Sequence, residues 1–243
     1  MTGETEAETG PRPEGALRIA SYNMRKAMGT DRRRDPHRIM RIVKALSADV
    51  VVLQEADRRY APRPSALPLQ ELEALTGMKR VPVPGNVSLG WHGNAILVGP
   101  DAVIDEVEYL ELPGIEPRGA LVADLSLGDR ELRVIAAHLG LLRPSRKGQL
   151  SAMFDHLAER PSRPTVIAGD MNEWSQKVGL GRLARRFTIH APGNSFHARL
   201  PVAALDRIAL DDRLELAHGG VLETRETRRA SDHLPIWVDV RPR

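Results

Sequence analysis

Short apolar runs alternate along this chain with amphipathic segments, and the two patterns predict different elements. Runs rich in β-branched side chains predict strands, and they cover Ala16–Tyr22, Val50–Gln54, Asn94–Val98, Val103–Leu110, Ala120–Leu127, Glu131–Ala137, Thr165–Ala168, Leu205–Leu210 and Leu234–Val240. Apolar residues spaced three and four apart predict helices, and these cover Pro36–Leu46, Leu69–Leu75, Pro144–Glu159 and Gly181–Arg186. The order lacks the regular alternation of a barrel or a doubly wound sheet, which favours an α/β sandwich.

Local signals support two of these elements and bound the domain. Asp35 stands directly before Pro36, where an aspartate caps a helix and a proline fits its first position. Gly128–Asp129 separates two apolar runs and predicts a hairpin turn. No linker divides the rest of the chain, so we expect one domain over residues 16–243. Residues 1–15 are acidic and rich in Gly, Thr and Pro, which predicts a disordered tail.

The composition narrows the chemistry. The 243 residues include no cysteine, which excludes disulfides, thiolate nucleophiles and thiolate metal sites. Metal ligands must then come from Asp, Glu, Asn and His, a set that suits oxygen-preferring cations such as Mg²⁺ or Mn²⁺. The apolar runs are far shorter than the roughly 20 residues of a membrane span, and the N-terminus has no apolar signal segment, so the cytoplasm is the default expectation.

The charge leaves the kind of partner open. A net charge of +3 and a pI near 9.5 favour an anionic partner. The basic residues are mostly arginines scattered along the chain, which fits a general arginine bias equally well. With three each of Trp, Tyr and Phe, the chain is poor in the aromatic platforms on which nucleic-acid bases stack.

Polar side chains that bind cations or move protons follow the apolar runs directly. Asn23 follows the first run and Glu55 follows the second. His138 and Asp170 end two later runs, and Asn172 stands two residues beyond Asp170. Ligand sites collect where strands stop and loops begin. We therefore expect these side chains to share one rim.

Six short motifs carry a family resemblance. They are Ser21–Tyr22–Asn23, Leu53–Gln54–Glu55–Ala56–Asp57–Arg58, Ala137–His138–Leu139, Gly169–Asp170–Met171–Asn172–Glu173, Leu205–Asp206–Arg207–Ile208 and Ser231–Asp232–His233–Leu234–Pro235. Together and in this order they resemble the endonuclease/exonuclease/phosphatase superfamily of deoxyribonuclease I-like metal-dependent phosphoesterases. The resemblance spans residues 16–240 and implies two mixed β-sheets packed face to face with outer helices, a four-layer α/β sandwich. More narrowly, the chain is similar to small bacterial stand-alone members.

The resemblance implies three groups of site residues. The expected ligands of Mg²⁺, with Mn²⁺ as the alternative ion, are Asn23, Glu55 and Asp232. The expected catalytic residues are His138, Asp170, Asn172, Asp206 and His233. The expected contacts to substrate phosphate are Arg25, Lys26, Arg58, Arg118 and Arg143.

These residue types suit the hydrolysis of a phosphate ester. Its anionic oxygens repel hydroxide, so the reaction needs a cation on the phosphoryl group, an oriented water and a stabilised leaving group. Asp170 would orient or deprotonate the water, and Asn172 would hold a phosphoryl oxygen. His233 would polarise that oxygen or move a proton, with Asp206 fixing its tautomer. His138 would donate to a phosphate oxygen or to the leaving group.

Structural alternatives stay open for these residues. Asp170 and Asn172 would equally form a turn that satisfies its own backbone. Each arginine would equally be a solvated surface cation. Arg25 stands where nuclease members often carry an acidic residue, which counts against a second cation there and favours a phosphate clamp. No residue matches the tyrosine that several nuclease members use.

The expected function is a divalent-metal-dependent hydrolase of phosphate esters, first of all a phosphodiesterase. A DNA endonuclease or exonuclease is the alternative within the superfamily, and a catalytically silent anion-binding module is the alternative outside it. A complete set of acid and imidazole positions counts against the silent module. The substrate is lipid-derived, small-molecule or nucleic-acid in origin, and the sequence indicates no obligate protein partner.

Overall fold

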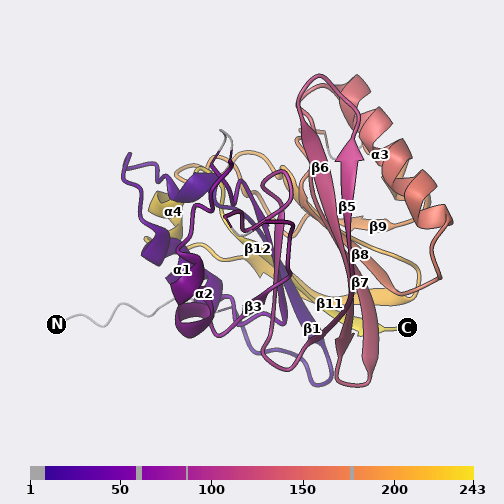
Figure 1. The fold of residues 1–243 in the computed structure, drawn as a ribbon, viewed down its shortest axis with the longest axis horizontal. Coiled ribbons are helices and arrows are strands. Elements are labelled where there is room, and N and C mark those ends of the chain that lie inside the picture. Colours follow the sequence, from indigo (N-terminus) through magenta and orange to yellow (C-terminus); the bar gives the residue numbers. More distant parts are fainter. Residues whose placement is uncertain (1–8, 59–61, 86, 176–177) are drawn as a thin grey trace.

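The chain folds as two β-sheets packed face to face (Figure 1). This computed structural model describes residues 9–58, 62–85, 87–175 and 178–243. Within these residues, the first sheet has six strands in the order β11 (Leu214–Val221), β12 (Ile236–Pro242), β1 (Leu17–Asn23), β2 (Val50–Gln54), β4 (Ala95–Val98) and β3 (Lys79–Arg80). The second also has six, in the order β5 (Val103–Leu112), β6 (Arg118–Leu127), β7 (Arg130–His138), β8 (Thr165–Asp170), β10 (Asp206–Leu210) and β9 (Thr188–His190).

Short helices connect and cover the sheets. They are α1 (Pro36–Ala45), α2 (Leu69–Thr76), α3 (Arg143–Ala158) and α4 (Thr227–Ala230), with the 3-10 turns η1 (Arg25–Ala27) and η2 (Leu183–Arg185). The predicted cap of α1 is present, because Oδ1 of Asp35 accepts a hydrogen bond from the backbone N–H of Arg38 at 2.9 Å. In the part of the chain that the structure describes, no helix combines the length and apolar character needed to cross a bilayer.

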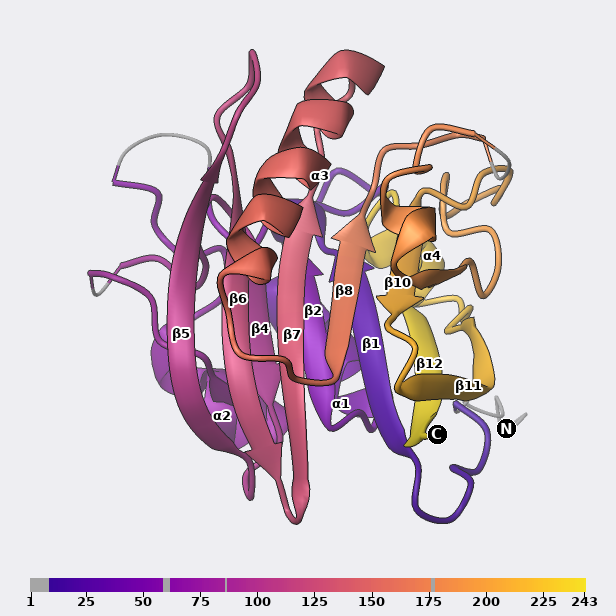
Figure 2. The ribbon, with the colours of Figure 1, turned by 90° about the vertical axis from the view of Figure 1, so that its right-hand side faces the viewer.

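Three apolar layers hold the sheets and helices together. Val52 of β2 and Val134 of β7 are buried between the sheets. The next residue along each strand faces the other way, as a period of two requires. Leu53 packs in the outer layer with α1 and α2, and Ile135 packs in the outer layer with α3 (Figure 2). Both faces of each sheet are therefore covered, which confirms the predicted four-layer α/β sandwich.

One pair of parallel strands in each sheet positions the polar strand ends. β1 runs parallel to β2 and β7 runs parallel to β8, so the carboxyl ends of each pair meet at one edge. Asn23 ends β1, and His138 lies opposite Asp170 at the ends of β7 and β8. The antiparallel strand β10 begins at that edge with Asp206 opposite Asp170, and the loop before β12 carries His233. Strand direction thus produces the expected rim.

The sequence pattern missed β3, β9, β11 and α4. β11 lies at the edge of its sheet, contains Gly219 and Gly220 and is interrupted by a β-bulge, so it lacks a clear alternation. β3 and β9 have only two and three residues. The last strand begins at Ile236 and not at the predicted Leu234, and the predicted helix at 181–186 is the 3-10 turn Leu183–Arg185.

The segment before β1 contacts the domain over part of its length. The hydroxyl of Thr9 donates to the backbone carbonyl of Leu46, and Nη1 of Arg12 lies 2.6 Å from Oδ2 of Asp49. Residues 1–8 of the predicted tail lie outside the described residues. The disorder of the tail and the domain boundary stay predictions.

Candidate active site

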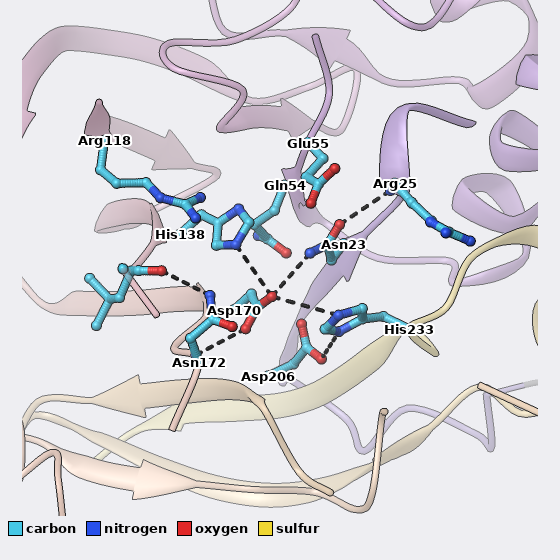
Figure 3. A network of polar contacts seen from close by, with 12 residues as sticks. Asn23, Arg25, Gln54, Glu55, Arg118, His138, Asp170, Asn172, Asp206 and His233 are labelled. Atoms are coloured by element: carbon cyan, nitrogen blue, oxygen red, sulfur yellow. Dashed lines mark hydrogen bonds and ion pairs between the residues drawn. The ribbon is translucent and has the colours of Figure 1, made fainter. Parts of the chain in front are cut away.

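A cleft of about 830 Å³ opens at the edge where the two parallel pairs end. Its lining residues are Asn23, Lys26, Glu55, Asp57, Arg58, Arg63, His92, Gly93, Glu116, Pro117, Arg118, His138, Leu141, Asp170, Asn172, Trp174, Phe196, Leu205, Asp232 and His233. Every predicted metal ligand and catalytic residue is in this set except Asp206, which lies behind His233 (Figure 3). The structure therefore brings together residues that are up to 210 positions apart in the chain, from Asn23 to His233.

Asp170 is the centre of the polar network. Its Oδ2 accepts a hydrogen bond from Nδ2 of Asn23 at 3.0 Å. The same oxygen lies 3.4 Å from Nε2 of His138 and 3.7 Å from Nε2 of His233 (Figure 3). Its Oδ1 accepts from the backbone N–H of Asn172 at 3.0 Å. Because the residue is only 2% exposed, protein groups fix the carboxylate in one orientation at the cleft.

Asn172 adopts the turn that was the structural alternative. Its backbone N–H is bonded to Asp170, and its Nδ2 donates to the carbonyl of Leu139 at 2.8 Å. Its φ of 49° lies in the left-handed region that asparagine tolerates. The residue still lines the cleft, so the turn and a role at the phosphate are compatible.

A chain of buried hydrogen bonds orients His233. Its Nδ1 lies 2.8 Å from Oδ2 of Asp206, which is fully buried. The hydroxyl of Ser195 donates to the same oxygen at 2.5 Å. An imidazole held by a carboxylate at one nitrogen presents the other nitrogen in a fixed direction. For His233 this is Nε2, which faces Asp170 and the cleft.

The two imidazoles of the site differ in charge near neutral pH, because one is protonated and the other is neutral. Burial disfavours the charged form of His233, but the charge and hydrogen bond of Asp206, with the charges of Asp170 and Asp232, raise its pKa to about 9. Burial lowers the pKa of His138 to about 3, and Asp170 only partly opposes this. His233 is therefore a cation at pH 7, and His138 is neutral.

The predicted metal ligands fit a hard divalent cation by donor type. Asn23 offers an amide oxygen, and Glu55 and Asp232 offer carboxylates, all on the lining of the cleft. Each carboxylate also contacts a cation of the 3-10 turn η1. Nζ of Lys26 forms an ion pair with Glu55, and Nε of Arg25 lies 3.3 Å from Oδ2 of Asp232. A metal ion would share these carboxylates with the side chains of η1.

The backbone holds η1 against the end of β2. The backbone N–H of Lys26 donates to the carbonyl of Glu55 at 3.0 Å. Arg25, Lys26 and Ala27 all have positive φ, at 47°, 57° and 58°, and Glu55 has a φ of 52°. Left-handed conformations cost free energy for such residues, and they persist where the surrounding structure enforces them. The two cations are therefore placed beside the carboxylates by a constrained turn.

A second group of possible ligands lies within the Asp170 network. One ligand atom each of Asp170, Asp206 and His233 lies within 4.8 Å of the others, and all three residues are buried. Nδ1 of His233 is bonded to Asp206, and the charge of that carboxylate raises the pKa of the imidazole to about 9. The protonated form that this favours donates a hydrogen bond from Nε2. This group is suited to proton transfer and charge stabilisation.

The comparison with known proteins assigns the family. The family model described as "Endonuclease/Exonuclease/phosphatase family" matches residues 20–233 of this chain. The chain belongs to this family. No curated protein shows a significant match.

Solved structures of the family share the fold. An endonuclease/exonuclease/phosphatase from Beutenbergia cavernae is 23% identical, with a TM-score of 0.72 over 96% of this chain and 72% of that chain. The human nocturnin catalytic domain with a bound sulfate anion is 18% identical, with a TM-score of 0.73 over 96% and 97%. The mannosyl-6-phosphatase Bt3783 of Bacteroides thetaiotaomicron is 18% identical, with a TM-score of 0.72 over 93% and 99%.

Not all the basic residues expected at the substrate phosphate reach the cleft of this family member. Lys26, Arg58 and Arg118 line it, and Nη2 of Arg118 is paired with Glu116 at 2.7 Å. Nε of Arg118 is buried without a hydrogen-bond partner, so the guanidinium has donor capacity left for a ligand. Arg25 and Arg143 are not among the lining residues, and Arg143 is exposed on the first turn of α3.

Several residues in or directly behind the cleft lie outside the six sequence motifs. Ser195 and Phe196 come from the loop before β10, and the ring of Phe196 lies 5.0 Å from that of His233. Trp174 follows the Gly-Asp motif and meets Phe196 edge to face at 6.0 Å. Arg63 and His92 stand in loops, and Nη1 of Arg63 lies 3.1 Å from Nδ1 of His92. A hydroxyl or an aromatic in a loop carries no spacing signal, so only the fold reveals these neighbours.

Proposed function

We propose that this chain is a divalent-metal-dependent phosphodiesterase that hydrolyses its substrate with an activated water. The observation that carries the proposal is the position of the Asp170 carboxylate, held between a neutral imidazole and a protonated one. A carboxylate beside a cationic acid can accept a proton from water while the cation stabilises charge on a phosphoryl oxygen. The family assignment supports the same chemistry.

Each residue then has a distinct part. Asp170 orients and deprotonates the attacking water, because its two oxygens are already fixed by protein donors. His233, charged and held by Asp206, donates from Nε2 to a phosphoryl oxygen or to the leaving oxygen. His138, neutral, serves as a hydrogen-bond partner to the phosphate and not as an acid. Arg118 adds a second cation on the His138 side of Asp170 (Figure 3).

A bound Mg²⁺ or Mn²⁺ would neutralise phosphoryl charge and lower the barrier to attack. Asn23, Glu55 and Asp232 would hold it, because each presents an amide or carboxylate oxygen on the lining of the cleft. Two relatives support phosphate as the ligand: the nocturnin domain holds a sulfate, which is a tetrahedral anion like phosphate, and Bt3783 is a mannosyl-6-phosphatase. The proposal assumes a cytoplasmic enzyme.

The test is turnover of bis(4-nitrophenyl) phosphate with Mg²⁺, with Mn²⁺ and with chelator, beside 4-nitrophenyl phosphate, abasic duplex and supercoiled plasmid. We expect diester turnover that chelation abolishes and Mg²⁺ restores. His233→Ala should lower the rate by about 10²- to 10⁴-fold. The matched control is His218→Ala, which removes an exposed imidazole of β11 and should leave the rate unchanged. Full activity after exhaustive chelation, or equal rates in the two variants, would refute the proposal.

A further inference from the structure

Exposed apolar side chains lie along one side of the cleft. Ile115 is 83% exposed, Leu141 62%, Leu142 54% and Trp174 64%. Single exposed apolar side chains are common on soluble proteins, but neighbouring ones beside a binding cleft mark an interaction surface. Leu141 and Trp174 also line the cleft itself. We call these four residues the apolar rim.

The segments that carry the apolar rim are packed together. The tip between β5 and β6 and the loop before α3 both abut the first turns of that helix. A β-carbon built on Gly114 would lie 3.5 Å from Cβ of Ser145, and one built on Gly140 would lie 3.2 Å from the same atom. Both views show the β5–β6 tip and the first turn of α3 at the same end of the molecule (Figures 1 and 2). Ile115 and Leu141 each follow one of these glycines directly, so the segments that carry them lie side by side.

Basic residues flank the apolar rim on α3. Arg143 and Lys147 are both exposed on the first turns of the helix, directly after the two leucines. The nearest acid on the β5–β6 tip, Glu116, is paired with Arg118. Exposed aliphatic and tryptophan side chains beside unburied basic ones form the pattern that binds at the headgroup level of an anionic bilayer.

An aromatic path joins the apolar rim to the reacting centre. Trp174 meets Phe196 at 6.0 Å, and Phe196 meets the imidazole of His233 at 5.0 Å. An apolar group attached to the scissile phosphate would thus have a continuous apolar wall from the catalytic imidazole to the edge of the cleft. The wall fits an acyl chain better than a run of nucleotides, because most of the apolar rim is aliphatic and offers no stacking platform.

We infer that the apolar rim docks the protein on an anionic phospholipid surface, so that the cleft receives phosphodiesters of lipid origin directly from the bilayer. The substrate part of this inference rests on the proposed function, whereas the docking part does not. A bilayer suits this surface better than a protein partner. A protein seated on Ile115, Leu141 and Trp174 would obstruct the cleft, while a bilayer would supply substrate to it.

The test measures co-sedimentation of the full chain with vesicles of phosphatidylcholine alone and of phosphatidylcholine with phosphatidylglycerol. Chelator is present, so no turnover is needed and the result is independent of the proposed function. The double variant Ile115→Ser/Leu142→Ser removes two exposed side chains and should reduce the partition coefficient by roughly tenfold or more. The matched control is Val103→Ser, because Val103 is 58% exposed at the opposite end of β5. Melting temperatures verify that all variants fold.

We expect the wild type and Val103→Ser to bind the anionic vesicles and the double variant to lose binding. Trp174→Ala should abolish the change in tryptophan fluorescence on vesicle addition. Absence of wild-type binding to anionic vesicles would overturn the inference. So would equal binding by the double variant, which would indicate attraction of the net positive charge alone. Self-association of the wild type that the double variant loses, without vesicle binding, would instead assign the apolar rim to a second copy of the chain.

Discussion

Asp206 makes the largest favourable contribution to the charged form of His233, and Asp206→Asn removes the charge of this carboxylate with little change of shape. In the native protein Asp206 is fully buried, 2.8 Å from Nδ1 of the imidazole, and is also bonded to Ser195. An asparagine oxygen can accept the same hydrogen bond but carries no charge. We therefore expect the variant to retain the ring orientation and to lose most of the stabilisation of the imidazolium.

The structure gives the size of the effect. The pKa of His233 is raised from 6.5 to about 9, a difference of about 2.5 units, which corresponds to ~3 kcal/mol at 1.36 kcal/mol per unit. Burial alone lowers this pKa, so without the charge of Asp206 it should fall. Because the folded pKa is the higher one, the contribution to folding stability is complete below pH 6.5 and is lost as the pH rises through about 9.

The assay is an NMR titration of the histidine ring signals in chelator, with His233→Gln identifying the signal among the eight histidines. We expect a pKa near 9 in the wild type and a markedly lower one in Asp206→Asn. Denaturant unfolding at several pH values should show that the wild type loses stability between pH 6.5 and 9 and that the variant does so much less. Asp212→Asn is the control, because Asp212 is exposed. If the pKa of His233 in Asp206→Asn stays within half a unit of the wild-type value, the reasoning is wrong.

Three further predictions concern the same cleft. Glu55→Gln should weaken Mn²⁺ binding, measured by calorimetry, with little change in the melting temperature; an unchanged titration would remove Glu55 from the metal site. Lys26→Met should tighten Mn²⁺ binding by roughly two- to fivefold, because Lys26 competes for the carboxylate of Glu55; Arg58→Met is the control, and weaker binding in Lys26→Met would contradict the competition. Combining His233→Ala with Asp206→Asn should slow single turnover little more than His233→Ala alone, whereas multiplied losses would separate the two residues.

Much of the fold followed from the sequence because its strands are strongly patterned. Val50–Gln54 and Thr165–Asp170 are buried along their whole lengths, and such runs are apolar whatever their neighbours. The missed strand β11 could not be found in this way, since its residues are mostly exposed or half-exposed at a sheet edge. Its pairing with β12 is a property of the sheet and not of the segment.

The sequence predicted those site residues that stand at the ends of strands. Asn23, His138 and Asp170 stand where parallel strands stop, and parallel strands of one sheet stop at the same edge. Loop residues follow no such rule: Arg143 follows the His138 strand closely in sequence, but α3 begins there and turns it outward. Ser195, which nothing in the sequence marks, is bonded to Asp206.

The two imidazoles differ in charge near neutral pH, although both lie within 4 Å of the same carboxylate oxygen of Asp170, at 3.4 and 3.7 Å. The difference comes from the other charged groups beside each imidazole. His233 has a buried carboxylate at its other nitrogen, whereas the further charges that act on His138 are the cations Arg118, His233 and Lys26. Environments that push two such pKa values apart divide acid and base functions between them. In the proposed mechanism His233 is therefore the proton donor and charge stabiliser, and Asp170, which lies within 4 Å of both imidazoles, takes the proton of the water.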